Sequence, residues 1–488
     1  MWLIDLLGGD LPEVKDEAGT ANTDITGLTC DSRQVEPGFL FAALPGAQAD
    51  GRAFIGEALG RGAICVLAPS GTRLPKGPPV SLLASDNPRR LFARMAAHFF
   101  EKQPATIAAV TGTNGKTSVV SFARQIWTRL GRAAGSLGTL GITAPEVKAP
   151  GRLTTPDPVE LHRRLRDLAL QGTECLALEA SSHGLAQYRL DGVEVAVGAF
   201  TNLSRDHLDY HGTMAAYQEA KARLFSDIMK PGATAVLNAD EASFPVLREI
   251  VKGRRQRVLS YGAAGADVRL DAIEPLAEGQ RLTLYIEGRP HTVDLPLLGA
   301  FQASNALCAL AVVLACGEDR EGAVAALSHL EVVRGRVELV ARHPNGSPIY
   351  VDYAHTPDAL AAVLSVLRSH VTGRLVVVFG CGGDRDAGKR PEMGRRAADL
   401  ADMVIVTDDN PRHEGPAEIR RQIRTGCPKA RDIGARRDAI GAGVSELGAG
   451  DLLVVAGKGH ETGQIVGSET RPFDDAEAAR AAVKELAP

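Results

Sequence analysis

The sequence lacks the features that mark secreted, zinc-binding and membrane-spanning proteins. Its seven cysteines are scattered and odd in number, and none are spaced as Cys-x-x-Cys, so we expect neither a disulfide framework nor a zinc site. No stretch is apolar enough to span a bilayer. The segment Met1 to Gly9 carries Asp5 and no basic residue, so we expect no signal peptide. These absences favour a protein of the reducing cytoplasm without a membrane partner.

The chain also lacks an excess of positive charge. Its formal net charge is −4 and no basic run occurs, which argues against a nucleic-acid partner. The hydrophobic content of 44% and the charged content of 23% are those of an ordinary globular protein. With 488 residues the chain is too long for one ordinary core, so we expect two to four domains.

What the sequence does contain is a glycine-rich run, Gly112-Thr113-Asn114-Gly115-Lys116-Thr117, between the apolar stretch Ile107 to Val110 and a helix-like segment, Thr117 to Leu130. A strand, a glycine turn and a helix start form a phosphate cradle, in which Lys116 neutralises charge and the Thr117 hydroxyl holds Mg²⁺. Val110 occupies the first glycine position of the general pattern, so the match is incomplete. The alternative is a glycine turn that only caps a helix.

Apolar runs that end in polar clusters follow this loop and predict buried parallel strands. They are Cys175 to Ala180, Val195 to Phe200, Arg374 to Gly380, Asp402 to Thr407 and Asp451 to Ala456. An open α/β sheet binds its ligands at such strand ends. We predict an α/β fold of three domains: residues 1–103, a central P-loop ATPase-type parallel sheet in residues 104–336, and a C-terminal Rossmann-like domain in residues 337–488.

Several polar groups at these strand ends are candidates for chemistry. Glu179 closes its strand and suits a Mg²⁺ ligand, although a helix-capping acid is an equal alternative. The run Asn202 to Gly212 holds two histidines, two aspartates and an arginine, which is dense for a structural loop. The run Gly380 to Gly383 could suggest dinucleotide binding, but Arg385 occupies the third glycine position of that pattern.

Three runs together resemble the muramyl-peptide ligase family of cell-wall synthesis. They are Gly112 to Thr117, Asn202 to Gly212 and Val351 to Asp358. Three more are similar to the members of that family that add diaminopimelate as the third peptide residue: Gly380 to Arg390, Asp408 to Arg412 and Gly457 to Glu461. The resemblance extends from Asp31-Ser32-Arg33 to Glu461.

The resemblance implies a cytoplasmic, monomeric, ATP-dependent amide ligase of peptidoglycan synthesis, which serves cell shape and division. Its substrates would be ATP, UDP-N-acetylmuramoyl-L-alanyl-D-glutamate and meso-diaminopimelate, and its metal Mg²⁺. ATP phosphorylates the D-glutamate carboxylate, and the incoming amine then displaces phosphate from the acyl phosphate. Catalysis of this kind is mostly positioning and charge neutralisation.

The resemblance also implies roles for residues of the nucleotide site. Lys116, His207, Lys221 and Asp352 would be catalytic, and Thr117, Glu179, His207 and Lys221 would hold magnesium. Lys221 would act as a carbamate, which requires a neutral amine and so a lowered pKa. ATP would be bound by Gly112, Thr113, Asn114, Gly115, Lys116, Thr117, Asn305, Arg336 and His355. The sequence departs from the family pattern at Gln302, where relatives often carry asparagine.

Two further sets of residues are implied by the resemblance. The UDP-sugar peptide would be bound by Cys30, Ser32, Gln48, Thr154, Thr155, Ser181, Gln187 and Arg189. Diaminopimelate would be bound by Arg385, Asp409, Asn410, Pro411, Arg412, Gly457 and Glu461. The forked guanidinium of Arg412 suits the second carboxylate of diaminopimelate, which lysine lacks.

Alternatives remain at this point. A relative that adds L-lysine and the folate polyglutamate ligases share much of the pattern, although a full domain before the phosphate loop argues against the latter. A P-loop ATPase without ligase activity is the alternative from another class. We expect the last domain to close on the central one by a hinge, because the predicted amino-acid residues and Lys116 lie on different domains.

Overall fold

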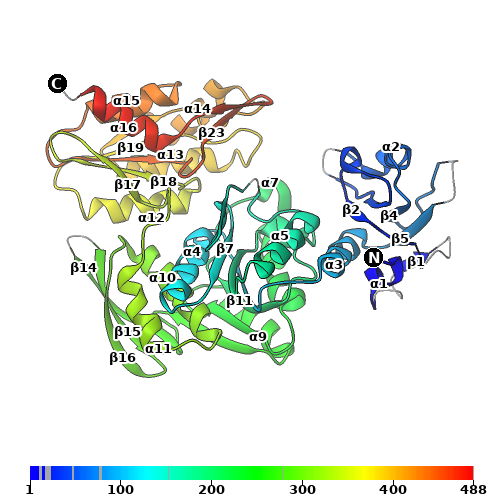
Figure 1. Ribbon diagram of the computed structural model, residues 1–488. Helices are drawn as coiled ribbons and strands as arrows, with labels where there is room; N and C mark the ends of the chain where they lie inside the picture. Colours follow the sequence, from blue (N-terminus) through cyan, green and yellow to red (C-terminus); the bar gives the residue numbers. More distant parts are fainter. Residues whose placement is uncertain are drawn as a thin grey trace.

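The computed structural model describes residues 1–9, 14–16, 23–46, 49–75, 80–151, 153–276 and 279–486. The chain forms an α/β protein of three domains, each built around its own sheet (Figure 1). The N-terminal domain lies on one side of the central domain, and the C-terminal domain lies over another side. Among the described residues, no helix combines the length and the apolarity that a bilayer crossing needs.

The N-terminal domain is a five-stranded sheet of order β1-β5-β4-β3-β2, parallel except for β1. Leu40 and Leu67 from the sheet pack with Phe92 and Met95 from α3 in its largest hydrophobic cluster. Its elements are α1 (Leu3–Leu7), β1 (Val14–Asp16), β2 (Gly27–Thr29), η2 (Ser32–Gln34), β3 (Phe39–Ala42), η3 (Gly51–Phe54), α2 (Ile55–Gly60), β4 (Cys65–Pro69), β5 (Ser81–Ser85) and α3 (Pro88–Phe100).

The central domain holds an eleven-stranded sheet of order β16-β15-β14-β13-β12-β11-β6-β10-β7-β8-β9. Its first half comprises β6 (Thr106–Thr111), α4 (Lys116–Arg129), β7 (Ala134–Gly138), β8 (Gly141–Ala144), β9 (Val147–Ala149), α5 (Pro158–Leu170), β10 (Cys175–Glu179), α6 (Ser182–Ala186), β11 (Val195–Phe200), α7 (Leu208–His211), α8 (Met214–Arg223) and η4 (Leu224–Ile228). The six strands in the middle of the sheet, β13-β12-β11-β6-β10-β7, are parallel. Strand β6 lies between β10 and β11, so its C-terminal end opens into the crevice where such sheets bind ligands.

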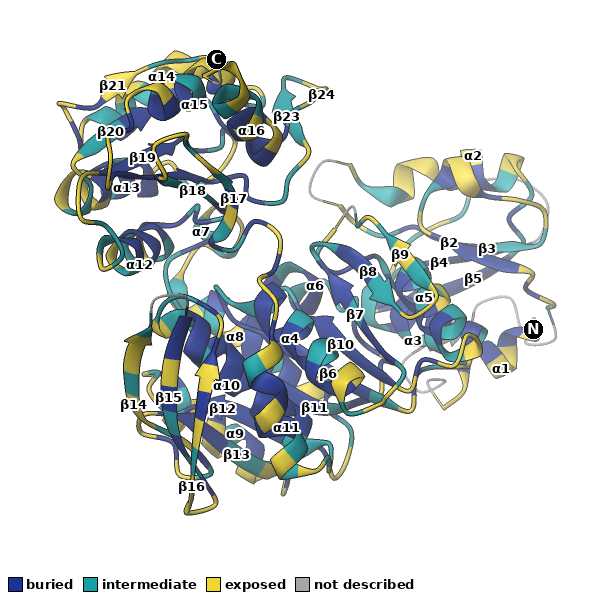
Figure 2. Cartoon of the chain, turned by 60° about the vertical axis from the view of Figure 1, so that its left-hand side comes forward, coloured by how far each residue is buried: buried dark blue, intermediate teal, exposed yellow. Residues whose placement is uncertain are grey.

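The second half of the central domain extends the sheet with an antiparallel meander, β14-β15-β16. Helix α10, buried along most of its length, packs against α4 and covers this half of the sheet (Figure 2). The elements are β12 (Thr234–Asn238), α9 (Phe244–Gly253), β13 (Arg257–Gly262), β14 (Val268–Leu276), β15 (Gly279–Ile286), β16 (Arg289–Leu295), α10 (Ala300–Ala315), α11 (Arg320–Ala326) and η5 (Leu327–His329).

The C-terminal domain is a six-stranded sheet of order β17-β18-β22-β19-β20-β21, parallel except for β17. A separate hairpin, β23-β24, stands at its edge (Figure 2). The elements are β17 (Glu338–Arg342), β18 (Pro348–Asp352), α12 (Pro357–Arg368), β19 (Leu375–Phe379), α13 (Lys389–Leu400), β20 (Met403–Val406), α14 (Pro416–Arg424), β21 (Arg431–Asp432), α15 (Arg436–Ser445), β22 (Leu452–Ala456), β23 (Gly463–Val466), β24 (Glu469–Pro472) and α16 (Asp475–Glu485).

The predicted strands occur where the apolar runs indicated. The runs at residues 175–180 and 195–200 form β10 and β11, and the three C-terminal runs form β19, β20 and β22. The predicted α/β class and the central parallel sheet are confirmed. The antiparallel meander β14-β15-β16 and the hairpin β23-β24 were not predicted, because half-exposed strands carry only a weak alternating pattern.

Candidate functional site

The glycine-rich run forms the turn between β6 and α4. Gly115 has a left-handed backbone (φ 88°) and caps the helix, and Gly112 also has a positive φ, 144°. A β-carbon on Gly115 would collide with the amide oxygen of Asn305, and one on Gly112 would collide with the Thr201 hydroxyl. Both positions therefore require glycine, and the free N–H groups at the start of α4 lie at the end of the central strand.

Two lysines donate to the carbonyls of this loop. Lys116 Nζ lies 2.9 Å from Gly112 O and 2.8 Å from Thr113 O, and Lys221 Nζ lies 2.7 Å from Gly112 O. Lys221 is almost fully buried, and its ammonium lies 4.2 Å from the centre of the Tyr217 ring. Burial, and then the charge of Lys116, hold the pKa of Lys221 well below its usual value. Burial also lowers the pKa of Lys116.

Glu179, at the end of β10, anchors a polar network beside the loop. Its Oε1 accepts from Thr139 N at 2.8 Å and its Oε2 from the Thr139 hydroxyl at 3.1 Å. The Thr139 and Thr154 hydroxyls lie 3.0 Å apart, and the Thr155 hydroxyl donates to Glu179 O at 2.9 Å. Glu179 therefore holds Thr139 through its carboxylate and Thr155 through its backbone carbonyl, and Thr139 in turn contacts Thr154.

The network continues through the other residues predicted for the same substrate. The Ser181 and Thr155 hydroxyls lie 3.0 Å apart. Arg189 donates to Thr155 O at 2.7 Å and to Gln187 Oε1 at 2.7 Å, and Gln187 in turn donates to the Tyr210 hydroxyl at 3.1 Å. The five residues come from three separate stretches of sequence and form one hydrogen-bonded network.

Histidine and tyrosine rings cover the other side of Lys221. The His183 ring lies 4.8 Å from that of His207 and 5.5 Å from that of His211, and the His211 and Tyr217 rings are 5.1 Å apart. Burial lowers the pKa of His207 to about 3 and that of His211 to about 4. Both imidazoles are thus neutral at physiological pH, which is the form that binds a metal.

Two of the residues predicted to bind ATP, Asn305 and Arg336, lie where the central domain joins the C-terminal domain. Asn305 Nδ2 donates to Gln302 Oε1 at 3.2 Å, and Gln302 Nε2 donates to Arg336 O at 3.4 Å. Arg336 lies 4.4 Å from the centre of the Tyr353 ring and donates to the Thr117 hydroxyl at 3.1 Å. The glutamine that departs from the family pattern thus joins Asn305 to the segment that carries Arg336.

Asp352, at the end of β18, is buried and engaged by the backbone. Its two oxygens accept from Val337 N and Ala354 N, both at 2.7 Å. Burial raises its pKa, while Arg336 acts to lower it. The carboxylate therefore holds the segment that follows Arg336 against the C-terminal sheet.

The central and C-terminal domains are in direct contact through the run that follows β11. Asp206 lies 3.4 Å from His207, 3.5 Å from His355 and 3.8 Å from Lys389. Beside it, Arg205 forms an ion pair with Asp386 at 3.0 Å. Despite burial, the hydrogen bond and charge of His355 hold the pKa of Asp206 far below its usual value.

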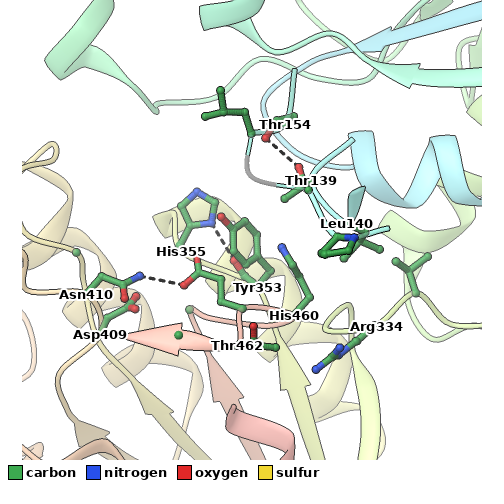
Figure 3. A pocket seen from close by; sticks show the side chains of 18 of the residues that line it. Thr139, Leu140, Thr154, Arg334, Tyr353, His355, Asp409, Asn410, His460 and Thr462 are labelled. Atoms are coloured by element: carbon green, nitrogen blue, oxygen red, sulfur yellow. Dashed lines mark hydrogen bonds between the residues drawn. The ribbon is translucent and has the colours of Figure 1, made fainter. Parts of the chain in front are cut away.

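A pocket of about 860 Å³ lies at this contact (Figure 3). Thr139 and Thr154 of the central domain lie on one side, and Tyr353, His355 and His460 of the C-terminal domain lie on the other. Its lining includes Thr154, His207, His355, Arg385, Asp409, Asn410, Arg412, Gly457 and Glu461. Residues predicted for the sugar peptide, the metal and the amino acid therefore face one space.

The C-terminal side of this pocket is built from the four loops that follow β18, β19, β20 and β22, and from the hairpin β23-β24. Arg412 has a left-handed backbone (φ 51°), its N–H donates to Ile465 O at 3.1 Å, and its Nη1 donates to Gly383 O at 2.8 Å. Burial, and then the charge of Arg385, lower the pKa of Arg412. Two neighbouring guanidinium groups repel each other, and an anion such as a carboxylate would relieve that repulsion.

A second pocket, of about 710 Å³, lies between the N-terminal and central domains. It is lined by Cys30 and Asp31 from the first domain and by Leu153 and Arg164 from the second, among others. Ser32 lies behind it and donates to Glu57 Oε2 at 2.8 Å. Gln48, also predicted for the sugar nucleotide, lies outside the described residues.

Comparisons with known proteins identify the family. Residues 24–100 match the model of the Mur ligase family catalytic domain, residues 110–313 that of the Mur ligase middle domain, and residues 335–459 that of the Mur ligase glutamate ligase domain. The chain belongs to the Mur ligase family.

Two curated Mur ligases are about half identical to this chain. The UDP-N-acetylmuramoyl-L-alanyl-D-glutamate–2,6-diaminopimelate ligase of Bradyrhizobium diazoefficiens is 51% identical, over 99% of each chain. The enzyme of the same name from Caulobacter vibrioides is 51% identical, over 92% of this chain and 94% of that one.

Solved structures of Mur ligases share the fold. A structure of a UDP-N-acetylmuramoyl-L-alanyl-D-glutamate–2,6-diaminopimelate ligase matches 96% of this chain and 97% of its own, with a TM-score of 0.69 and 35% identity. The MurF ligase of Thermotoga maritima in complex with ADP matches 95% of this chain and 97% of its own, with a TM-score of 0.63; at 21% identity it supports the fold alone.

The donor groups at the phosphate loop fit a magnesium ion. The Thr117 hydroxyl and the Glu179 carboxylate are hard oxygen ligands, and a metal held mainly by substrate phosphates needs only one or two such groups. Within the described part of this Mur ligase, no cluster of three histidine, cysteine, aspartate or glutamate side chains that could hold a metal occurs. Lys221 fits the same role only as a carbamate, because an ammonium cannot bind a cation.

Not every predicted residue of this Mur ligase faces the reaction pocket, the pocket of about 860 Å³ between the central and C-terminal domains. Behind its lining, or in the adjacent networks, lie Gly112, Thr113, Asn114, Gly115, Lys116, Thr117, Asn305, Arg336, Thr155, Ser181, Gln187, Arg189, Glu179, Lys221, Asp352 and Pro411. Their assigned roles stay predictions.

Two residues that the sequence reasoning did not single out lie at the centre of the site. Lys389 meets Asp206 across the domain contact, and Lys458 is fully buried beneath Asn410 and Glu461. The sequence signal that could have found Lys458 is its place between two glycines directly after a buried strand. Lysines are usually exposed, but a glycine turn at the end of a buried strand can direct a side chain inward.

Proposed function

We propose that this Mur ligase joins meso-diaminopimelate to the D-glutamate of UDP-N-acetylmuramoyl-L-alanyl-D-glutamate, with ATP as the energy source. The single observation that carries the proposal is the shared pocket, which is lined by Thr154 and His207 on one domain and by Arg385, Arg412 and Glu461 on the other. The relatives that carry this activity in their names are about half identical over nearly the whole chain.

The proposed reaction has two steps, and both need the negative charge of the phosphates to be stabilised. An oxygen of the D-glutamate carboxylate attacks the γ-phosphorus of ATP, ADP leaves, and an acyl phosphate forms. The amine of diaminopimelate then attacks the acyl carbon, phosphate leaves with the bonding pair, and the nitrogen loses a proton. The helix start after Gly115 and the Lys116 ammonium would stabilise the negative charge on the phosphates.

In the same proposal, Thr117 and Glu179 hold one magnesium ion, and His207 and the Lys221 carbamate serve a second. The metal neutralises charge on the phosphates when bound. Lys116, His207, Lys221 and Asp352 remain the proposed catalytic set. Asp352 would act by fixing the backbone beside Arg336, since both of its oxygens accept backbone hydrogen bonds.

The distal end of diaminopimelate carries an ammonium and a carboxylate. Arg412 and Arg385 supply the cations for the carboxylate, and Glu461 and Asp409 supply the acceptors for the ammonium. We propose that Cys30, Ser32 and Gln48 of the first domain bind the UDP group, and that Thr154, Thr155, Ser181, Gln187 and Arg189 hold the sugar peptide.

We further propose that the enzyme acts in the cytoplasm as a monomer, and that its domains divide after residues 103 and 336. Helix α3 ends at Phe100 and β6 begins at Thr106, whereas η5 ends at His329 and β17 begins at Glu338. Hinge closure at the second boundary would bring the amino acid to the acyl phosphate.

A phosphate-release assay with each substrate omitted in turn tests the function. The proposal requires release only when ATP, the UDP-linked dipeptide and diaminopimelate are all present. Release with ATP alone would indicate the P-loop ATPase alternative, and equal use of L-lysine would indicate the lysine-adding one.

The variant Arg412→Ala tests the specificity. Loss of a forked, charge-assisted contact should raise the KM for diaminopimelate roughly 10- to 100-fold and leave the KM for ATP unchanged. The matched control Arg421→Ala removes an exposed arginine of α14 that pairs with its neighbour Glu418. If both variants change the KM equally, Arg412 does not bind the amino acid.

A further inference from the structure

Lys458 lies directly behind the amino-acid side of the reaction pocket. Its neighbours Gly457, His460 and Glu461 line the pocket, whereas Lys458 itself has no exposed surface and does not line it. Its Nζ donates to Asn410 Oδ1 at 3.0 Å, to Glu461 Oε2 at 3.0 Å and to Asp409 Oδ1 at 3.4 Å. The three donors of one ammonium thus meet acceptors on three residues that all line the pocket.

The backbone around Lys458 is fixed in a way that turns its side chain inward. Gly457 and Gly459 have φ values of 114° and 53°. A β-carbon on Gly459 would lie 2.7 Å from the Tyr353 β-carbon and 2.9 Å from Gly335 O, so the loop packs directly on the segment that joins the two domains. The lysine is therefore held by its loop, independently of the groups that it contacts.

The contacts of Lys458 decide which way the Asn410 amide points. Asn410 Oδ1 accepts from Lys458 Nζ and from Ile465 N, at 3.0 and 2.9 Å, and its Nδ2 donates to Glu461 Oε2 at 2.9 Å. If the amide turned over, its NH₂ group would face an ammonium and an N–H, and its oxygen would face a carboxylate. Only one orientation satisfies all three neighbours.

Lys458 also balances the charge of this side of the pocket. Burial acts to raise the pKa of Asp409, but the charges of Lys458 and Arg436 and the hydrogen bond from Lys458 together lower it below its usual value. Both Asp409 and Glu461 pair with this one ammonium, at 3.4 and 3.0 Å. Without it, two carboxylates and a movable amide would share the position that an incoming ammonium needs.

We propose that Lys458 is the positioning residue of the amino-acid site: it fixes Asn410 and Glu461 in the arrangement that accepts the distal ammonium of the substrate. This inference rests on the proposed function, because it names diaminopimelate as that substrate. Lys458 acts through Asn410 and Glu461 and does not touch the reacting atoms.

The test is a comparison of Lys458→Met with the wild type in the phosphate-release assay. We expect the KM for diaminopimelate to rise roughly 10- to 100-fold, as for loss of a hydrogen bond to a charged group, with a smaller change in kcat. The KM values for ATP and for the UDP-linked dipeptide should stay within about twofold, because those substrates meet other residues.

Val444→Ala is the matched control. Val444 is fully buried in α15, in a hydrophobic cluster that contains none of the pocket residues. It should lower the melting temperature and leave the KM for diaminopimelate unchanged. The proposal is overturned if Lys458→Met lowers the melting temperature in the same way without a selective rise in that KM.

If Lys458→Met does not fold, Lys458→Gln replaces it, since its amide keeps a donor for Asn410 without the charge. The same selective rise in KM supports the proposal. If neither variant folds, the proposal is overturned, because the lysine would then serve the fold alone. A wild-type protein that releases no phosphate with diaminopimelate contradicts the proposed function instead, before any variant is compared.

Discussion

The two sides of the reaction pocket each contain a buried lysine, but in opposite surroundings. Lys221, in the central domain, donates to one backbone carbonyl and lies against the Tyr217 ring, and it has no carboxylate partner among the described residues. Lys458, in the C-terminal domain, pairs with the carboxylates of Asp409 and Glu461. The first lysine is thus buried with no acid of the described chain in contact with it, and the second is buried between two acids.

This difference matches two kinds of chemistry. Burial without an acid lowers the pKa of Lys221, and a neutral amine is the form that reacts with carbon dioxide to give a carbamate. Burial between two acids instead makes Lys458 a fixed cation that orders its neighbours. Burial without an acid therefore suits Lys221 to react, whereas burial beside two acids suits Lys458 to hold its neighbours in place.

The largest expected effect comes from removing the reactive lysine. Lys221→Ala should lower kcat by on the order of 10³-fold, because a proposed metal ligand is lost beside the phosphates. Phosphate release with all three substrates measures the change. Lys252→Ala is the control, since Lys252 is an exposed lysine on α9 that pairs with Glu249.

The difference between Lys221 and Lys458 can also be tested by measuring the mass of the intact protein. The intact wild-type protein, kept in bicarbonate, should carry the mass of one carbon dioxide that Lys221→Ala lacks and Lys458→Met retains. An adduct that persists in Lys221→Ala, or is lost in Lys458→Met, would place the carbamate elsewhere and break the comparison.

A smaller effect is expected at His162, another titratable side chain that is buried without a carboxylate in contact with it in the described part of the chain. It is 1% exposed, and burial lowers its pKa from 6.5 to about 4. Because the unfolded chain binds the proton more readily, the folded state loses stability as the pH falls from about 6.5 to about 4. This one group contributes at most about 3 kcal/mol to that loss.

The variant His162→Leu should therefore show a flatter dependence of unfolding free energy on pH, measured with urea between pH 7 and pH 4. The control is His329→Leu, in which an exposed histidine is replaced. An unchanged slope in His162→Leu would mean that the buried ring titrates as it does in the unfolded chain.

The smallest expected effect concerns the contact between the two sides. Arg205 pairs with Asp386 across the domains but is 40% exposed, so the pair contributes about 1 kcal/mol or less. Arg205→Ala should enlarge the radius of gyration of the free enzyme in solution scattering and raise the KM for diaminopimelate a few-fold. Identical scattering of the variant and the wild type would show that this pair does not hold the domains together.

The two sides also differ in how much of them could be predicted from sequence. The phosphate loop is contiguous, from Gly112 to Thr117, and its turn geometry depends on local glycines, so a short motif indicates it. The strands β10, β11, β19, β20 and β22 are continuous apolar runs and were predicted for the same reason.

The amino-acid side was harder to predict, because it forms from four distant loops and a hairpin. Arg412 was recognised through a resemblance, but its support by Ile465 depends on a bridge between separate segments. The contacts of Lys458 and the pairing of Lys389 with Asp206 depend on tertiary packing that no local pattern encodes. The hairpin β23-β24 is half exposed and gave little signal.

The central claim is that the D-glutamate carboxylate is phosphorylated in this pocket before the amine attacks it. The most direct test follows an oxygen atom from that carboxylate to the released phosphate. The γ-carboxylate of the D-glutamate in the UDP-linked dipeptide is labelled with heavy oxygen, and the phosphate released during ligation of diaminopimelate is analysed by mass spectrometry. We predict that one labelled oxygen appears in each released phosphate, because the carboxylate is phosphorylated before the amine attacks. Phosphate without label, released at the same rate as the amide forms, would contradict the account.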